Sequence, residues 1–404
     1  MSLSEELQWR GFVNQTTYPD IKVLDGEPIK FYMGVDPSAD SMTIGNLAAI
    51  MMVRQFIEHG HKAYLLVGGA TGLIGDPDGK KDERNLKTLD EIAANKAAIA
   101  NQYSQVLAGQ PFEVVDNYDW FKDINYLDFL RDIGKHVPMG NMLSRDFVQS
   151  RIGEGGSGIS YAEFSYSLIQ GYDFVHLYRN HGVTLQLCGA DQWGNSVTGV
   201  DLIRRIEGGE AHVYSLPLVI NKTTGVKFGK SEDGAVWLDS RKTSVYKFYQ
   251  FWLNVDDAGV IDYAKIYTLL TRESIEELER ERNENPGARA AQKALAYEVT
   301  RVVHGVEAAD SAEKVTSVLF GGTEFGDLSD ADVDLLAGEI STASLGGSVT
   351  DLLALAGIAS SKGEARRLLQ GGGISVNGTK ITEDVTINEK SLVKKGKNSF
   401  LLVK

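Results

Sequence analysis

The sequence has a single cysteine, Cys188, among its 404 residues. One thiol excludes an internal disulfide framework and suits a reducing compartment, so we expect a cytoplasmic protein. No apolar run is long enough to cross a bilayer, so no membrane association is expected. The first residues, Met-Ser-Leu-Ser-Glu-Glu, are too acidic and polar for a secretory signal. No cluster of Cys and His has the spacing of metal ligands, which argues against a zinc site.

Positive charge is also scarce. The net charge is −14, which by itself argues against a protein that binds nucleic acid. Residues 345–404, however, contain nine Lys and Arg against five Asp and Glu, so this segment carries +4 and the remainder carries −18. A basic module on an acidic body indicates a nucleic-acid-binding domain or, alternatively, a basic tail that binds nothing.

The first half of the sequence alternates apolar strands with helices. Residues 29–35 and 63–67 have the composition of short buried strands, and residues 47–59 between them have helical periodicity. This β-α-β order predicts a parallel sheet with a right-handed crossover. Such sheets bind ligands at the carboxyl ends of their strands, where the loops at 34–46 and 68–80 fall.

The predicted fold class is α/β, with a Rossmann-like parallel-sheet domain over residues 1–220 and a mainly helical insertion at about 110–150. A helix is expected over 164–178, followed by a strand over 183–188. The length of 404 residues leaves room for further domains. We expect them in this order: a polar loop and linker at 221–244, a helical domain at 245–320, an acidic linker at 321–344, and a small α+β module at 345–404.

A segment rich in hydrogen-bond donors leads directly into the first of these helices. A helix N-terminus offers unpaired N–H groups and a positive dipole end, so it attracts phosphate. Gly45 leaves room for a ligand against the backbone, and Ser38, Thr43 and Asn46 can all donate hydrogen bonds. Ordinary capping of the helix by Thr43 explains the same residues.

Five glycines lie among the thirteen residues from Gly68 to Lys80. Their spacing is not that of a phosphate-binding Gly-x-x-x-x-Gly-Lys-Ser/Thr loop. They allow the backbone to approach a ligand closely, and they place Asp76 beside it. A long flexible turn is the alternative, although one or two glycines suffice for a turn.

Tyr166, Gln170 and Asp173 follow one another at i, i+4 and i+7 in the helix expected over 164–178. This spacing puts all three on one face. Leu168 and Phe174 indicate that much of the helix is buried, and a polar stripe on a buried helix needs partners. A solvated outer face accounts for the spacing equally well.

Two polar segments follow later in the chain. Asp191 and Gln192 come just after the strand that ends at Cys188, and a carboxylate there suits ribose hydroxyls. Lys227 and Lys230 lie three residues apart on a Gly-containing loop, where they can close over a polyphosphate and neutralise departing pyrophosphate. Lysines at this spacing are also common in surface loops.

Taken in this order, the motifs resemble those of class I aminoacyl-tRNA synthetases, and among them the bacterial tyrosyl-tRNA synthetases. The resemblance extends over essentially the whole length. The segments similar to the family's own are 32–41, 68–77, 164–173 and 189–195. Residues 227–231, Lys-Phe-Gly-Lys-Ser, match the mobile KMSKS loop, and residues 360–369 with 373–378 resemble an S4 RNA-binding domain.

The resemblance implies that the chain activates L-tyrosine with ATP and Mg²⁺ and transfers it to tRNA(Tyr) as a homodimer. It implies no bound organic cofactor and no zinc. Tyr32 and Asp173 would bind the phenolic hydroxyl of tyrosine. The α-ammonium group would be held by Asp76, Tyr166 and Gln170, and the carboxylate by Gln192.

The resemblance also implies roles towards ATP and RNA. The residues that would bind ATP, ribose or adenylate are Gly34, Asp36, Ser38, Gly45, Gly189, Asp191 and Lys230. The residues that would act in catalysis, several of them on pyrophosphate, are Thr43, Asn46, Lys80, Arg84, Lys227, Lys230 and Ser231. The residues that would contact RNA are Lys362, Arg366 and Arg367.

One motif departs from the family. The His-Ile-Gly-His element is Thr43-Ile-Gly-Asn46 in this chain, so both imidazoles are replaced by neutral hydrogen-bonding groups. This keeps open an RNA-binding paralogue with weak or lost aminoacylation, although Asp191, Lys227 and Lys230 are retained. A tryptophanyl-tRNA synthetase is a second alternative, against which Tyr32, Asp173 and the S4-like tail favour tyrosine.

Overall fold

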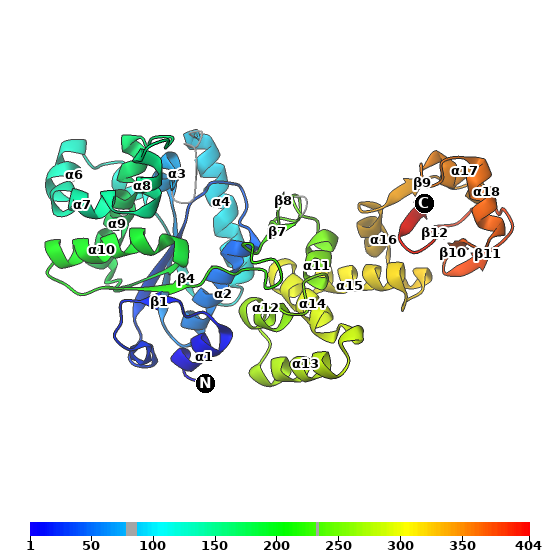
Figure 1. Cartoon of the computed structure of the whole chain (residues 1–404), viewed down its shortest axis with the longest axis horizontal. Helices are drawn as coiled ribbons and strands as arrows, with labels where there is room; N and C mark the ends of the chain where they lie inside the picture. Colours follow the sequence, from blue (N-terminus) through cyan, green and yellow to red (C-terminus); the bar gives the residue numbers. More distant parts are fainter. Residues whose placement is uncertain (78–86, 232–233) are drawn as a thin grey trace. The chain divides into compact units, whose positions relative to one another are not determined.

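The computed structural model describes residues 1–77, 87–231 and 234–404 (Figure 1). The chain divides into two compact units. The first comprises residues 1–243 and 254–295, and the second comprises residues 244–253 and 296–404.

A six-stranded sheet in the order β1-β6-β5-β2-β3-β4 forms the centre of the first unit. Its strands are β1 (Gln15–Thr16), β2 (Lys30–Val35), β3 (Lys62–Val67), β4 (Phe112–Asp116), β5 (Leu185–Gly189) and β6 (His212–Leu216). Neighbours from β4 to β6 are parallel, whereas β1 is antiparallel to β6. The chain proceeds outward from β2 to β4 and from β5 to β6, so β2 and β5 flank a topological switch point, where ligands bind in such sheets.

Helices cover both faces of this sheet. The side chains of a strand alternate between faces, so Phe31 and Tyr32 of β2 point in opposite directions. Phe31 packs against Phe56 of α2 (Ile44–Glu58), with ring centroids 5.2 Å apart, and Tyr32 lies 5.2 Å from Phe174 of α9 (Tyr161–His181). The predicted strands and the helices expected at 47–59 and 164–178 are confirmed, with ends that shift by up to three residues.

Local signals set the ends of α9. Ser160 caps its N-terminus in a reciprocal capping box with Glu163, and Gly182 ends the helix in the left-handed conformation at φ 67°. The Glu163 carboxylate also accepts hydrogen bonds from Arg151, and both side chains are buried. Glu163 therefore ties α9 to α8 (Asp146–Ile152), the last helix of the insertion.

The prediction of a mainly helical insertion at about 110–150 is wrong at its start, because residues 112–116 form the edge strand β4. This strand is largely exposed or half-buried, so it lacks the apolar run by which β2 and β3 are recognised in the sequence. The insertion then contains the short helices α5 (Tyr118–Phe121), α6 (Tyr126–Asp132), α7 (Met139–Leu143) and α8. The Gly-rich segment likewise contains a short helix, α3 (Gly69–Ile74), after β3.

The remaining helices of the first unit are α1 (Leu3–Arg10), α4 (Leu89–Val106), α10 (Trp193–Ile206), α12 (Val260–Tyr267) and α13 (Arg272–Glu284). Helix α14 (Ala290–His304) begins at the end of this unit. Within the predicted loop at 221–244, β7 (Lys230–Ser231) and β8 (Gly234–Ala235) form a short antiparallel pair.

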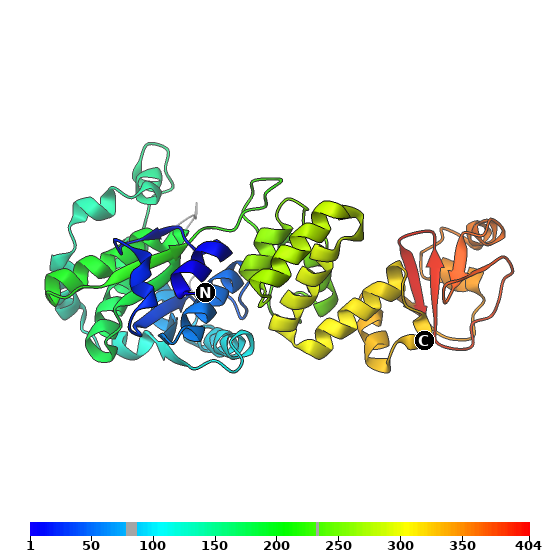
Figure 2. The same ribbon diagram turned by 90° about the horizontal axis from the view of Figure 1, so that it is seen from below.

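A five-stranded sheet in the order β11-β10-β12-β13-β9 lies in the second unit, orange to red in Figure 2. Its strands are β9 (Ser341–Ala343), β10 (Ile374–Val376), β11 (Thr379–Ile381), β12 (Ser391–Lys395) and β13 (Ser399–Val403). The helices of this unit are α11 (Val245–Leu253), α15 (Val306–Phe320), α16 (Asp330–Ala337), α17 (Val349–Leu355) and α18 (Lys362–Gln370).

The acidic linker predicted at 321–344 is wrong, because this segment is folded. Ser329 and Asp332 form a capping box that starts α16, whose Val333 and Leu336 are buried. The acidic residues that suggested a solvated linker therefore begin a helix. One apolar cluster joins α15, α16 and the sheet, and its buried members are Val315, Leu319, Phe325, Val333, Leu336, Leu392, Phe400 and Leu402.

The buried guanidinium of Arg10 holds α1 against the end of α12. It pairs with Glu6 at 2.6 Å and donates hydrogen bonds to the carbonyl oxygens of Lys265, Thr268 and Leu270. The carbonyl groups of Lys265 and Thr268 lie at the C-terminal end of α12, where they have no partners within the helix, and that of Leu270 lies in the connection to α13.

We predict that Arg10→Met lowers the free energy of unfolding by about 3–5 kcal/mol, because it leaves the Glu6 carboxylate and the carbonyl groups buried without their donor. Arg272→Met is the matched control, since Arg272 is half exposed and pairs with Glu276 at the surface. Urea unfolding measures both values, and equal losses in the two variants would contradict the role of Arg10.

Candidate active site

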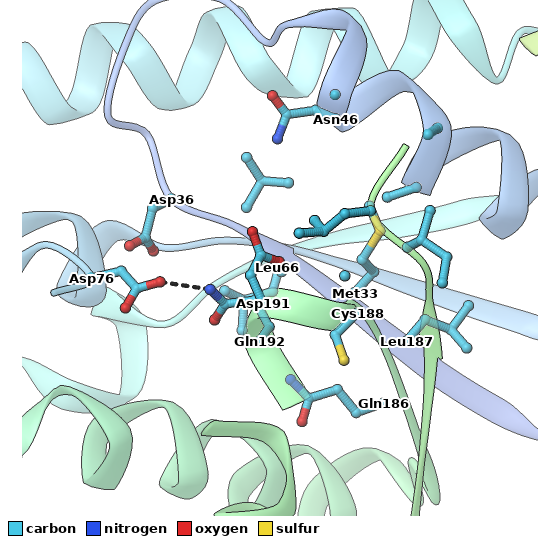
Figure 3. A pocket seen from close by; sticks show the side chains of 18 of the residues that line it. Met33, Asp36, Asn46, Leu66, Asp76, Gln186, Leu187, Cys188, Asp191 and Gln192 are labelled. Atoms are coloured by element: carbon cyan, nitrogen blue, oxygen red, sulfur yellow. Dashed lines mark hydrogen bonds between the residues drawn. The ribbon is translucent and has the colours of Figure 1, made fainter. Parts of the chain in front are cut away.

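A cavity of about 320 Å³ opens at the carboxyl ends of the parallel strands, at the switch point between β2 and β5. Its walls come from the end of β2, the N-terminus of α2, α3, α9 and the turn Ala190–Gln192 (Figure 3). Most of the residues predicted for the site line it together. They are Tyr32, Gly34, Asp36, Ser38, Thr43, Gly45, Asn46, Asp76, Tyr166, Gln170, Asp173, Gly189, Asp191, Gln192 and Lys227.

The polar stripe of α9 faces this cavity. Tyr166, Gln170 and Asp173 all line it, and only 5% of Tyr166 and 1% of Asp173 is exposed. A solvated outer face is therefore excluded for these residues. The Gln170 Oε1 atom is buried and has no hydrogen-bond partner among the described residues, so it is available to a ligand.

The cavity wall includes a buried carboxyl group, that of Asp173. Asp173 accepts hydrogen bonds from Asn117 Nδ2 at 3.0 Å and from Trp120 Nε1 at 2.9 Å. Burial raises the pKa of Asp173 well above its usual range, and the nearby carboxylates of Asp36 and Asp116 raise it further, whereas the two hydrogen bonds act in the opposite direction.

Tyr32 lines the same cavity, and its hydroxyl group is close enough to Asp173 to interact with it electrostatically. Only 1% of Tyr32 is exposed, and its hydroxyl has no hydrogen-bond partner among the described residues. Burial and the neighbouring Asp173 raise the pKa of Tyr32 well above its usual value, so the phenol keeps its proton and can donate it in a hydrogen bond. Asp173 and Tyr32 together suit a ligand that carries a hydroxyl group.

Two further carboxylates are held by short hydrogen bonds. Asp36 accepts from the Tyr166 hydroxyl at 2.7 Å and from Thr71 Oγ1 at 2.6 Å. Asp76 accepts from Gln192 Nε2 at 2.6 Å (Figure 3). With the carbonyl oxygen of Gln170, these groups favour a cation in this part of the cavity.

Thr43 and Asn46 pair with each other at the start of α2. Thr43 is the N-cap, and both its backbone N–H and its hydroxyl donate to Asn46 Oδ1, at 3.0 and 3.1 Å. A backbone N–H can only donate, so the amide oxygen must face Thr43 and the amide nitrogen faces the cavity (Figure 3). Capping and ligand binding are therefore compatible in this motif.

The predicted lysine loop is described only in part. Lys227 Nζ lies 3.4 Å from Asp191 Oδ2, and both side chains are accessible. Lys80 and Arg84 lie outside the described residues, and so do the side chains of Lys230 and Ser231, whose backbone forms β7.

Several residues that line or support the cavity are not predicted from the sequence. Gln186 lines the cavity and has a buried Oε1 atom without a partner among the described residues. The sequence does contain an indication of Gln186, because an amide side chain between Leu185 and Leu187 is unusual in an apolar strand. Asn117 and Trp120 gave no such signal, since they follow β4, which the sequence does not reveal.

The residues predicted to contact RNA lie in the second unit. Lys362, Arg366 and Arg367 are exposed on α18, which begins after the N-cap Ser361. Lys362 Nζ pairs with Asp351 at 2.8 Å. Their exposure fits an RNA-binding face and equally fits solvated surface charges.

Comparison with known proteins gives consistent matches over the whole chain. Residues 24–321 match the family model "tRNA synthetases class I (W and Y)", and residues 337–403 match "Tyrosine--tRNA ligase SYY-like C-terminal domain". Tyrosine–tRNA ligase of Bacillus caldotenax is 45% identical over the full length of both chains. That of Bacteroides fragilis is 44% identical over 100% of this chain and 99% of the relative.

Solved structures agree with these matches. A C-terminally truncated mitochondrial tyrosyl-tRNA synthetase of Aspergillus nidulans has a TM-score of 0.69 and 30% identity, covering 77% of this chain and 92% of that one. Tyrosyl-tRNA synthetase of Archaeoglobus fulgidus, at a TM-score of 0.56 and 14% identity over 77% and 100%, shares the fold. In the described part of the chain, no helix has the length and hydropathy needed to span a membrane.

The raised pKa of Asp173 predicts a pH-dependent stability. The pKa of Asp173 in the folded state lies above its unfolded value of about 3.9. At a pH between these two pKa values, the folded state keeps the carboxyl proton of Asp173 and the unfolded state has lost it. Across that window, Asp173 lowers the free energy of unfolding by about 1.4 kcal/mol per pH unit. Relative to Asp173→Asn, which has no such proton, the unmodified protein should therefore lose stability from pH 5 upward in urea unfolding. Asp351→Asn, at the surface, is the control, and parallel pH profiles for the unmodified protein and Asp173→Asn would contradict the prediction.

Proposed function

The chain belongs to the class I tRNA synthetases for tryptophan and tyrosine and, within them, to the tyrosine–tRNA ligases, and we propose that the cavity between β2 and β5 is where it binds tyrosine and ATP. The enzyme activates L-tyrosine with ATP to tyrosyl-adenylate and pyrophosphate and then transfers tyrosine to the 3′ end of tRNA(Tyr). The full-length relatives favour this activity over an RNA-binding paralogue.

The phenol of tyrosine lies, in this proposal, between Tyr32 and Asp173. The observation that carries the assignment is the Tyr32 hydroxyl, which is buried beside the Asp173 carboxyl group and has no partner among the described residues. A buried donor without an acceptor costs free energy, and the substrate hydroxyl supplies the acceptor. Gln186 faces the same cavity and adds a further acceptor.

The α-ammonium group lies among Asp76, Tyr166 and Gln170. Asp76 supplies negative charge, and the Gln170 carbonyl oxygen supplies a neutral acceptor. The carboxylate of tyrosine then points towards Gln192, whose amide nitrogen also contacts Asp76. This arrangement orients the carboxylate for attack on the α-phosphorus of ATP.

ATP lies, in this proposal, along the N-terminus of α2. The N–H groups of this turn and the Asn46 amide nitrogen donate hydrogen bonds to ATP. Gly34 and Gly45 leave space for the nucleotide, and Ser38 donates a further hydrogen bond. Asp191 and Gly189 contact the ribose. Mg²⁺ would accompany the phosphate groups, as it does with most nucleotide substrates. Lys80, Arg84, Lys227, Lys230 and Ser231 are the candidates for stabilising pyrophosphate as it departs.

The reaction needs no covalent enzyme intermediate. The tyrosine carboxylate attacks in line, so the site contributes positioning and stabilisation of the charge that develops on the phosphate. The terminal ribose hydroxyl of tRNA then attacks the bound adenylate, and α18 supplies phosphate contacts for the RNA. We also expect a two-fold dimer through the insertion, because closed two-fold symmetry is the common solution for homo-oligomers.

Tyr32→Phe tests the phenol pocket. We predict that kcat/KM for tyrosine in tyrosine-dependent ATP–pyrophosphate exchange falls about tenfold, the cost of one neutral hydrogen bond, while the value for phenylalanine does not fall. Tyr103→Phe is the matched control, since Tyr103 is also buried with an unpartnered hydroxyl among the described residues but does not line the cavity. If the ratio of kcat/KM for tyrosine to kcat/KM for phenylalanine did not change, Tyr32 would not be the residue that recognises the phenol.

Arg366→Gln with Arg367→Gln tests the RNA face. Deleting the tail would uncover the apolar cluster on α15 and α16, so substitution is the cleaner change. We predict unchanged pyrophosphate exchange, weaker charging of tRNA, and a shallower dependence of charging on salt, because fewer counterions are released. Lys390→Gln with Lys404→Gln, which also removes two surface cations, paired with Asp330 and Asp334, is the control for net charge. Charging that equals that of the control would place the RNA contacts elsewhere.

A further inference from the structure

Arg145 connects the insertion to the wall of the cavity. It is the residue before α8, and its guanidinium group reaches across to the first turn of α10. There it donates to Asn195 Oδ1 at 2.7 Å, to the Gly194 carbonyl oxygen at 2.9 Å and to Thr198 Oγ1 at 2.6 Å. Arg145 does not line the cavity.

Two amide groups continue from Arg145 to the substrate site. Asn195 Nδ2 donates to Gln192 Oε1 at 3.3 Å, and Gln192 Nε2 donates to Asp76 Oδ2 at 2.6 Å (Figure 3). Only 4% of Asn195 is exposed, so bulk water has little access to this link. The four side chains thus form a continuous relay from the insertion to a carboxylate in the cavity.

The relay has a fixed direction. A guanidinium group can only donate hydrogen bonds, so the oxygen of Asn195 must face Arg145 and its nitrogen must face Gln192. The oxygen of Gln192 is then the acceptor from Asn195, and its nitrogen is turned towards the cavity and Asp76. An ionised carboxylate can only accept, so Asp76 enforces the same direction from the other end.

This direction decides what Gln192 offers to a substrate. One hydrogen of its amide nitrogen goes to Asp76, and the second remains as a donor, which a carboxylate can accept. With Gln192 in the opposite orientation, its carbonyl oxygen would face both Asp76 and the substrate carboxylate and would repel them.

We propose that Arg145 is a positioning residue for tyrosine activation, which acts by fixing Gln192 as a hydrogen-bond donor to the tyrosine carboxylate. The assignment of that carboxylate to Gln192 rests on the proposed function. Arg145 itself touches no substrate and belongs to a different part of the chain from the residues that do.

The first test is ATP–pyrophosphate exchange without tRNA. Arg145→Met should lower kcat/KM for tyrosine about tenfold, the effect of one lost or misdirected hydrogen bond, while the KM for ATP stays unchanged. Arg145→Lys, which keeps a donor, should lose less. Arg131→Met is the matched control, because Arg131 is an exposed arginine of the insertion that pairs with Asp132. Arg145→Met that behaves as this control would overturn the proposal.

A double-mutant cycle separates the relay from simple anchoring of the insertion. If Arg145 acts through Gln192, Arg145→Met should have no further effect on exchange in a Gln192→Ala background. Additive losses would show that Arg145 supports the fold and not the orientation of Gln192.

Asn195→Asp keeps the test usable if Arg145→Met does not fold. Aspartate retains the contact with Arg145 but removes the donor to Gln192, so the insertion stays anchored while the relay is broken. We expect a loss of exchange similar to that of Arg145→Met, with an unchanged melting temperature. Full activity in this variant would overturn the proposal, whereas absence of tyrosine-dependent exchange in the unmodified protein would instead refute the proposed function.

Discussion

The side-chain amide of Asn117 connects the elements on which the cavity depends. It is fully buried at the end of β4, where it accepts from the backbone N–H of Ala70 and donates to Thr71 Oγ1 and to Asp173 Oδ2. Thr71 in turn donates to Asp36. One side chain therefore sets the position of α3, of the α9 carboxyl group and, indirectly, of a second carboxylate. Such a buried network is stable only when each member has its partners, and a satisfied network makes the geometry of the cavity rigid before any ligand binds.

The sequence predicts best what depends on local pattern. The strands β2, β3 and β5 are short apolar runs, α2 and α9 have clear periodicity, and the i, i+4, i+7 stripe of α9 places three side chains in one cavity. Asn117, Trp120 and Arg145 could not be predicted in this way. Each acts through partners more than 40 residues away in the chain, and such contacts leave no local periodicity.

Two predictions from the sequence are wrong, each for its own physical reason. Strand β4 is an edge strand with mostly exposed or half-buried side chains, so it lacks the apolar run of a buried strand. Helix α16 begins with acidic residues, whose composition suggests a solvated linker. One of them, Asp332, instead forms a capping box with Ser329 and so starts the helix. Charge composition alone therefore misjudges segments whose charges serve the ends of helices.

The position of Cys188 gives this chain an unusual property. It is the single thiol of the sequence, and it lies in the wall of the cavity at the end of β5. Burial raises the pKa of Cys188 to about 12, so the thiol stays protonated and unreactive while the surrounding structure is closed. A thiol-directed label on the unmodified protein can therefore attach only at the wall of this cavity, and its rate of attachment reports how often that wall opens.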